Sequence, residues 1–196
     1  MADRGVVVSY ESVRGWCHKF GRVYAKRLRM RRGPSGDAWY WDEVVLKIAG
    51  RCQYLWRAVD QEGQVIEFLV QSHRDANAAR RFFRLLLKGE GTAPRKLVTD
   101  PLRSYLGAAR QGMTSAIHVR DKGANNRAEN SHQPTRERER RRRRFKSAGE
   151  AQRFLSTFSS ISNHFRVSRH LMTASTHRML TGRRIAEWRA ICECNE

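Results

Sequence analysis

Three carboxylates, Asp42, Asp100 and Glu129, stand at positions where the surrounding pattern does not ordinarily place one. Asp42 follows the aromatic residues 39–41 inside a strand pattern, in which Asp is depleted. Burying a charge is costly unless it is paired or bound to a metal, so Asp42 needs a cation beside it. Side chains alternate along a strand, so Asp42 and Glu43 face opposite sides and only one of them can join a given site.

The other two carboxylates also have ordinary interpretations. Asp100 ends a short apolar segment, and ligands collect at strand ends in α/β sheets. An Asp directly before Pro101 is equally a common helix N-cap. Glu129 lies in the polar stretch 125–133, and on a helix it would share a face with Arg136. Taken alone, that spacing is typical of a solvent-exposed polar helix.

The elements that must position these residues begin with a group of strands. Three apolar, β-rich segments separated by short turns predict an antiparallel meander, and they are residues 44–48, 54–59 and 65–70. A helix should follow, capped by Asp75, with an apolar face and with Gly89 just past its end.

Further strands and helices alternate after the meander. Residues 96–99 predict a short buried strand, Asp100 opens the next helix, and residues 117–119 form another apolar segment. This order implies crossover connections, so the body is expected to be a mixed α/β sheet flanked by helices. Ser147 and Glu150 form a capping box that opens a later helix, and a last helix lies around Trp188.

The first 32 residues predict a helical segment in front of this body. Ser9 can cap a helix, and an apolar stripe follows it at helical spacing, made of Val13, Trp16, Cys17 and Phe20. A helical segment of this length resembles the second half of a helix-turn-helix motif, in which the second helix enters the major groove of DNA. The breaker cluster 33–36 is the expected linker. We therefore expect a partial helix-turn-helix at 1–32, a core at 37–166 and a C-terminal helical extension at 167–196.

Net charge and composition indicate which classes of partner this chain can bind. Lys and Arg number 39 against 19 Asp and Glu, a formal net charge of +20, so a polyanion is expected. Apolar residues make up 40% of the chain and aromatic residues 9%, so the chain as a whole is not a disordered basic tail. No apolar stretch is long enough to span a membrane and no signal peptide is visible, so a cytoplasmic protein is expected. Cys192 and Cys194 have no matching partner pair, and we assign them no metal.

Several segments together resemble a known family. They are WDEVVLKI at 41–48, YLWRAVD at 54–60, LVTD at 97–100, LRSY at 102–105, NNRAENSHQ at 125–133 and RFKS at 144–147. In these segments the chain resembles a DDE-type transposase of the bacterial insertion-sequence-six family, and the block around Glu129 is the most specific.

The resemblance implies a ribonuclease-H-like fold on which Asp42, Asp100 and Glu129 are catalytic acids holding two Mg²⁺ or Mn²⁺ ions. Two such ions about 4 Å apart stabilise both the attacking and the leaving oxygen of a phosphoryl transfer. The implied reaction cuts double-stranded DNA at terminal inverted repeats and joins the freed 3′ hydroxyl to target DNA. It also implies a homodimer on DNA at the bacterial nucleoid. In relatives a Lys often follows the second Asp, where this chain has Pro101.

Basic residues supply the predicted DNA contacts. Those on the N-terminal helix are Arg14, His18 and Lys19, and those after Glu129 are Arg136, Arg140, Arg141, Arg142, Arg143 and Arg144. Phosphate contacts of this kind position a duplex without specifying its sequence. Two alternatives remain: a truncated, noncatalytic DNA-binding remnant of such a transposase, and, with less support, a nuclease acting on RNA hybrids.

Overall fold

The computed structural model describes residues 8–99, 107, 113–120, 137, 145–167 and 172–193. The chain divides into two compact units, one formed by Gly33–Leu155 and the other by Met1–Arg32 together with Ser156–Glu196. Among the predicted site residues, the following lie outside the described ranges: Asp100, Glu129, Arg136 and Arg140 to Arg144.

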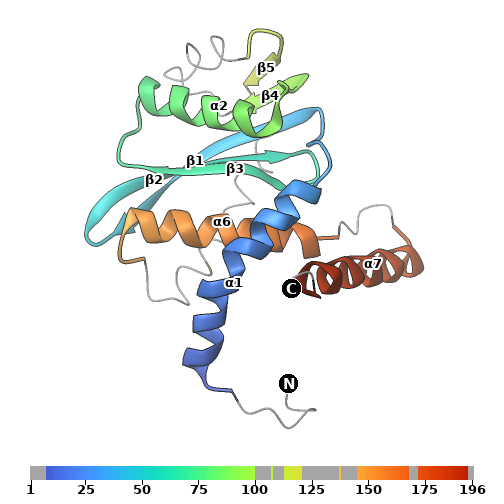
Figure 1. Cartoon of the computed structure of the whole chain (residues 1–196). Helices are drawn as coiled ribbons and strands as arrows, with labels where there is room; N and C mark the ends of the chain where they lie inside the picture. The colour runs from blue at the N-terminus through green and yellow to red at the C-terminus, as the bar shows by residue number, and fades with distance from the viewer. Residues whose placement is uncertain are drawn as a thin grey trace. The chain divides into compact units, whose positions relative to one another are not determined.

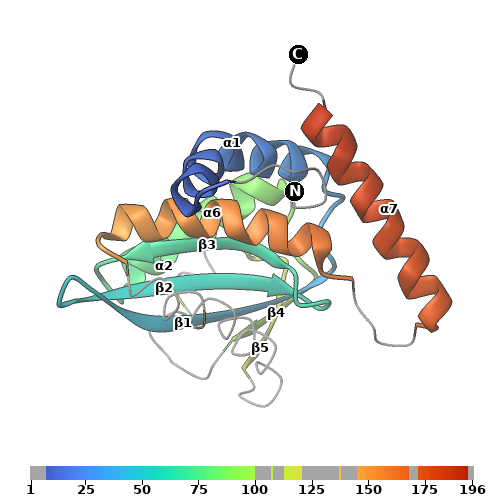
Figure 2. The same cartoon turned by 90° about the horizontal axis from the view of Figure 1, so that it is seen from below.

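A five-stranded mixed sheet forms the body of the unit 33–155, with the strand order β3-β2-β1-β4-β5 (Figures 1 and 2). The strands are β1 (Ala38–Ile48), β2 (Arg51–Asp60), β3 (Val65–Gln71), β4 (Lys96–Thr99) and β5 (Ile117–Arg120). The first three are antiparallel neighbours, which confirms the predicted meander. The last two run parallel to β1, as crossover connections require. β1 extends further toward the N-terminus than the apolar segment 44–48 alone indicates.

The two hairpin turns explain the register of the meander. β1 and β2 are joined by Ala49 and Gly50, both with positive φ, at 49° and 76°. That conformation suits the right-handed twist of the strands. At the second turn the carboxylate of Asp60 accepts hydrogen bonds from the backbone N–H groups of Glu62 and Gln64, each at 2.9 Å.

The helix α2 (Ala76–Glu90) covers one face of the sheet (Figure 1). Asp75 caps it as predicted, accepting from the N–H of Ala78 at 2.7 Å. The predicted end at Gly89 is wrong: the helix continues to Glu90 and ends at Gly91, which has φ 74°. Gly91 rather than Gly89 takes the left-handed conformation that closes the last turn.

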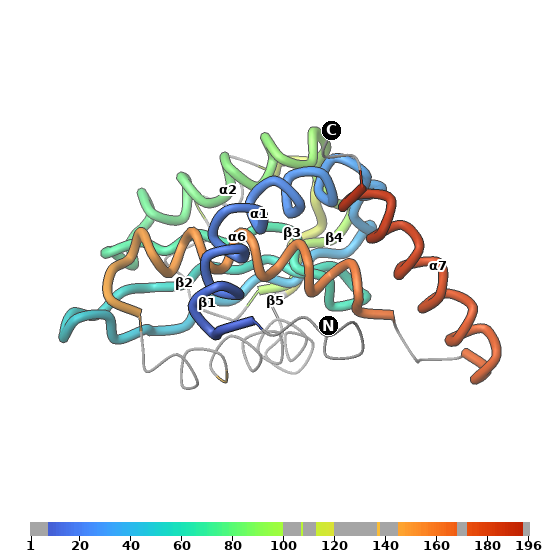
Figure 3. The backbone as a smooth tube through the Cα atoms, turned by 60° about the horizontal axis from the view of Figure 1, so that its bottom comes forward, coloured from blue at the N-terminus to red at the C-terminus, as the bar shows by residue number. Residues whose placement is uncertain are grey.

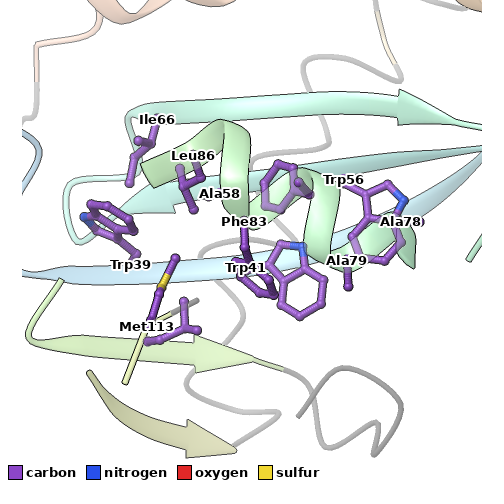
Figure 4. Close-up of a cluster of buried hydrophobic side chains, with 12 residues drawn as sticks. Trp39, Trp41, Trp56, Ala58, Ile66, Ala78, Ala79, Phe83, Leu86 and Met113 are labelled. Atoms are coloured by element: carbon purple, nitrogen blue, oxygen red, sulfur yellow. The ribbon is translucent and has the colours of Figure 1, made fainter. Parts of the chain in front are cut away.

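An aromatic core fills the space between α2 and the sheet (Figure 4). The ring of Trp41 stacks on that of Trp56, with centroids 5.3 Å apart, and meets Phe83 edge-on at 4.9 Å. Both tryptophans are almost completely buried. This cluster orients the side of β1 that carries Trp39 and Trp41 toward α2.

The opposite face of the sheet packs on the first part of α6 (Ala148–Phe165), as Figure 1 also shows. The capping box is present, because Ser147 accepts from the N–H of Glu150 at 3.1 Å and the Glu150 carboxylate accepts from the N–H of Lys146 at 2.8 Å. The core on this face is made of Val44, Leu46, Ile48, Leu55, Phe68, Phe145, Ala151 and Leu155.

The other unit contains α1 (Tyr10–Arg31), the C-terminal part of α6 and α7 (Ala174–Glu193). Ser9 caps α1 as predicted, accepting from the N–H of Ser12 at 3.1 Å. Trp188 of α7 meets Tyr24 edge-on at 5.5 Å, and the guanidinium of Arg27 donates to the carbonyl of Ile191 at 2.8 Å.

The apolar stripe predicted on the N-terminal helix does not form a core. Val13 and Trp16 are 43% and 41% exposed, and the buried residues of α1 are Gly21, Ala25 and Leu28 in its C-terminal half. The spacing correctly indicates a helix, but it does not tell which turns have a partner. None of the helices within the described ranges is long and apolar enough to cross a membrane.

Candidate active site at β1 and β4

Asp42 lies in the middle of β1 on the face of the sheet that carries Val44 and Leu46. Its alternation with Trp41, which faces α2, follows from the period of two along a strand. The residue is partly exposed rather than buried. Asp42 is therefore a candidate source of the hard carboxylate oxygens that a divalent cation prefers.

Glu43, the neighbouring carboxylate, has a different role. It faces the side of the sheet that α2 covers, and it forms an ion pair with Arg74, which lies just before that helix. The Glu43 side chain is 7% exposed, and its partner is 39% exposed. Since alternation allows only one of the two carboxylates into a given site, this ion pair favours Asp42 for chemistry.

The parallel pairing of β1 with β4 bears on the position of Asp100, the second predicted acid, because Asp100 directly follows β4 in the chain. The register aligns Trp41 with Thr99, and these residues directly precede Asp42 and Asp100 in the chain. Thr99 is 4% exposed, and its hydroxyl hydrogen-bonds the Nε2 atom of His118 on β5 at 2.9 Å. The end of β4 is thus held from both sides, by β1 and by β5.

The structure leaves the convergence of the three acids as a prediction, since Asp100 and Glu129 lie outside the described residues. Within the described part of the chain, no cluster of three or more His, Cys, Asp or Glu side chains is arranged to hold a metal ion. Only Asp42 of the predicted triad therefore has a described position.

Arg57 belongs to the segment YLWRAVD at 54–60, and its residue type and position in that segment assign it no role by themselves. It lies on β2 directly across from Asp42 in the antiparallel register, and it is 2% exposed. Directly opposed residues on neighbouring strands have Cβ atoms about 5 Å apart and share one face. Burial lowers the pKa of the Arg57 guanidinium to about 10, so the group stays a cation at neutral pH.

A sequence signal for Arg57 exists. The neighbours two positions away, Leu55 and Val59, are fully buried, so alternation places an Arg among core positions of the strand. A charged residue at such a position requires compensation, and Asp42 is the acid directly across from it.

The described DNA-contact candidates lie in the N-terminal half of α1. Arg14, His18 and Lys19 are all exposed. Arg14 pairs with Glu11 at 3.5 Å, an exposed contact that holds it weakly. The ammonium of Lys19 lies 5.2 Å from the ring centroid of Phe20. Their DNA contacts stay predictions.

The cysteine pair near the C-terminus is described only at Cys192, because Cys194 lies outside the described residues. Burial raises the pKa of the Cys192 thiol, while a hydrogen bond with Tyr24 acts in the opposite direction.

Comparisons with known proteins agree on one family. Residues 36–168 match the family described as a DDE domain, of the IS240 transposase type. The chain is 30% identical over 100 residues to the transposase for insertion sequence-like element IS431mec of Staphylococcus aureus, and equally to the transposase for insertion sequence element IS257 in transposon Tn4003. Each alignment covers 51% of this chain and 44% of the relative. The chain thus spans under half the length of these two transposases.

A solved structure supports the fold. The chain is similar to one in the simian T-cell lymphotropic virus intasome, determined in complex with PP2A regulatory subunit B56 gamma, with a TM-score of 0.54 and 16% identity. The similarity covers 73% of this chain and 54% of that one. With the strand order 3-2-1-4-5 and its antiparallel and parallel halves, the sheet is ribonuclease-H-like, as predicted.

Proposed function

The chain belongs to the DDE domain family of transposases, and we propose that it catalyses metal-dependent cleavage and strand transfer of DNA at the terminal inverted repeats of an insertion sequence. The observation that carries the proposal is the family match over residues 36–168, which contains Asp42, Asp100 and Glu129. The structure adds support at the first acid, because Asp42 is partly exposed on β1 and lies on the opposite side of the strand from Glu43, which pairs with Arg74.

The donor set fits a hard divalent cation. Asp42 offers carboxylate oxygens from a partly exposed strand position, and the pairing of Trp41 with Thr99 supports the idea that Asp100 joins the same site. We propose that these two residues and Glu129 hold two Mg²⁺ or Mn²⁺ ions. When bound, the ions stabilise charge on the attacking and leaving oxygens of the phosphoryl transfer.

The protein's own residues orient the reactants. Arg57 lies across from Asp42 on β2, and its positive charge restrains the Asp42 carboxylate by electrostatic attraction. Arg136, seven positions after Glu129, is proposed to hold a terminal phosphate. No covalent protein nucleophile is required, since the 3′ hydroxyl of the cleaved strand attacks the target phosphodiester.

We propose double-stranded DNA of the bacterial nucleoid as the substrate, bound through Arg14, His18, Lys19 and the arginines 140–144. A homodimer would bring two DNA ends together. The segment 1–32 is proposed to act as part of a helix-turn-helix, and within the described residues its structured portion is the single helix α1.

Strand transfer with inverted-repeat duplexes tests the proposal. We expect Asp42→Asn, Asp100→Asn and Glu129→Gln each to abolish Mn²⁺-dependent joining. The control Glu62→Gln, which removes a carboxylate from an exposed turn, should leave activity unchanged. Residual activity in all three triad variants would refute the assignment.

Calorimetric titration with Mn²⁺ separates an enzyme from a noncatalytic DNA-binding remnant. The unchanged protein should bind Mn²⁺ in a manner that depends on Asp42 and Glu129, because carboxylate oxygens are the expected ligands. Identical titration of the parent and of the Asp42→Asn variant would instead support the remnant.

A further inference from the structure

A groove with three basic residues in its lining lies between α1 and the C-terminal part of α6, in the unit formed by 1–32 and 156–196. Its volume is about 360 Å³, and it is lined by Arg22, Val23, Ala25, Lys26, Arg29, Ser156, Thr157 and Ser160. Figure 3 shows α1, in blue, crossing α6, in orange. We propose that this groove, called here the α1–α6 groove, binds the phosphodiester backbone of duplex DNA. The choice of DNA as the polyanion rests on the proposed function.

Helical periodicity places the three cations of the groove in one row. Arg22, Lys26 and Arg29 are spaced i, i+4 and i+7, so they share a face of α1. The buried residues Gly21 and Ala25 belong to the stripe one position earlier, which packs inside this unit. The cationic row therefore follows the edge of the contact between the helices, and all three of its side chains are exposed.

Close approach of the two helices creates the wall of the groove. A Cβ atom added at Gly21 would lie 2.9 Å from the Cγ2 atom of Thr157. Because glycine leaves that space open, α6 brings the hydroxyl residues Ser156 and Ser160 next to the basic row.

The chemistry of the lining fits a phosphate ester. Hydroxyl groups rotate and can donate to phosphate oxygens, while Arg and Lys neutralise their charge. In the structure the Ser160 hydroxyl donates to the carbonyl of Ser156 at 3.1 Å, a bond that rotation can exchange for a phosphate oxygen. Among the described residues that line the groove, none is acidic.

The length of the row fits several consecutive phosphates. Seven residues of α-helix rise about 10 Å, and one DNA strand rises about 3.4 Å per nucleotide. The row from Arg22 to Arg29 therefore spans about three nucleotide steps. Arg27 has a separate role, since its guanidinium donates to the carbonyl of Ile191.

Salt-dependent DNA binding tests the groove. We would measure the Kd of the full chain for a 30-base-pair duplex by fluorescence anisotropy in EDTA, across a series of NaCl concentrations. The groove variant is Arg22→Gln/Lys26→Gln/Arg29→Gln. The matched control, Arg80→Gln/Arg81→Gln/Arg84→Gln, removes the same number of charges from the exposed side of α2.

We expect the groove variant to bind about 100-fold more weakly near 0.15 M salt and to lose about 2.7 from the slope of log K against log salt, the value for three phosphates. The control should change Kd by less than about threefold, because charges without a phosphate contact release few counterions. Equal losses in the two variants would overturn the groove, since they would report only net charge. Circular dichroism and melting of both proteins exclude misfolding as the cause.

A second variant addresses the hydroxyl wall. Ser156→Ala/Ser160→Ala should weaken binding about tenfold at every salt concentration, because a hydrogen bond to a charged group is lost. The salt slope should not change, because no counterion release is affected. Unchanged affinity would exclude α6 from the contact and overturn the groove.

The DNA-binding assay and the strand-transfer assay can each refute one proposal without refuting the other. Binding in EDTA does not involve the divalent ions, so intact affinity of the groove variant would end this inference while transposition stands. Conversely, strand transfer that survives loss of all three acids would end the proposed function while a weakened groove variant still supports DNA binding here.

Discussion

Gly21→Ala is the substitution whose consequence follows most directly from the packing. Gly21 is buried in α1, and a methyl group there would lie 2.9 Å from the Cγ2 atom of Thr157, closer than Cβ atoms approach in folded proteins. Thr157 is β-branched and sits within a helix, so few χ1 rotamers are available to move its methyl group away. The clash must be relieved by a shift of one helix against the other.

Two opposing free-energy contributions set the effect of Gly21→Ala on stability. Alanine in a helix interior is favoured over glycine by about 0.8–1.0 kcal/mol, and overpacking a filled contact costs about 1–3 kcal/mol. The net expectation for Gly21→Ala is a loss of about 1 kcal/mol in the free energy of unfolding. For a chain of this size, that is a fall in Tm of about 2–4 °C.

A double-mutant cycle with Thr157→Ser isolates the contact. Serine lacks the Cγ2 atom, so in that background Gly21→Ala should stabilise the protein by about 1 kcal/mol through helix propensity alone. The coupling between the sites is then about 2 kcal/mol. Urea unfolding of the four proteins, followed by circular dichroism, measures it. If Gly21→Ala has the same effect in both backgrounds, α1 and α6 do not approach each other at this point.

Three further predictions concern other parts of the chain. Ala49→Asn should raise the free energy of unfolding by about 0.5–1 kcal/mol in urea, because position 49 has φ +49° and Asn tolerates that turn conformation better than Ala; a lower Tm would contradict the turn. Arg57→Met should lower the free energy of unfolding in urea and slow strand transfer, because Asp42 loses the cation across from it on β2; full activity would remove Arg57 from the proposed site. Cys192, whose thiol pKa is raised by burial, should react with iodoacetamide at pH 8 more slowly than the exposed Cys17, as mass spectrometry of the labelled peptides would show; equal rates would contradict its burial.

Local features of the fold were predictable because their causes are local. The caps at Ser9 and Asp75 and the capping box at Ser147 all form, since each depends on one side chain and a backbone N–H three residues away. The meander follows from alternation and short turns. The end of α2 was misplaced by two residues, because either Gly89 or Gly91 could have closed the helix and sequence does not rank them.

Long-range partners were not predictable in the same way. The stripe containing Trp16 has the spacing of a packed face, yet in the structure it is exposed, because helical period reports a stripe and not the presence of a neighbour. Arg57 and the α1–α6 groove depend on strand register and on helices far apart in the chain. No local pattern contains that information.

By itself the sequence determined the family, through motifs that place three acids at defined positions, and it determined the basic character from which a polyanionic partner is predicted. Only the tertiary structure shows what lies beside each of the two adjacent carboxylates. Glu43 is drawn into an ion pair with Arg74, while Asp42 lies across the ladder from Arg57. The physical reason is that side chains alternate along a strand, so the two residues must point to opposite sides of the sheet. The charged groups that each carboxylate meets there come from chain segments that are distant in sequence.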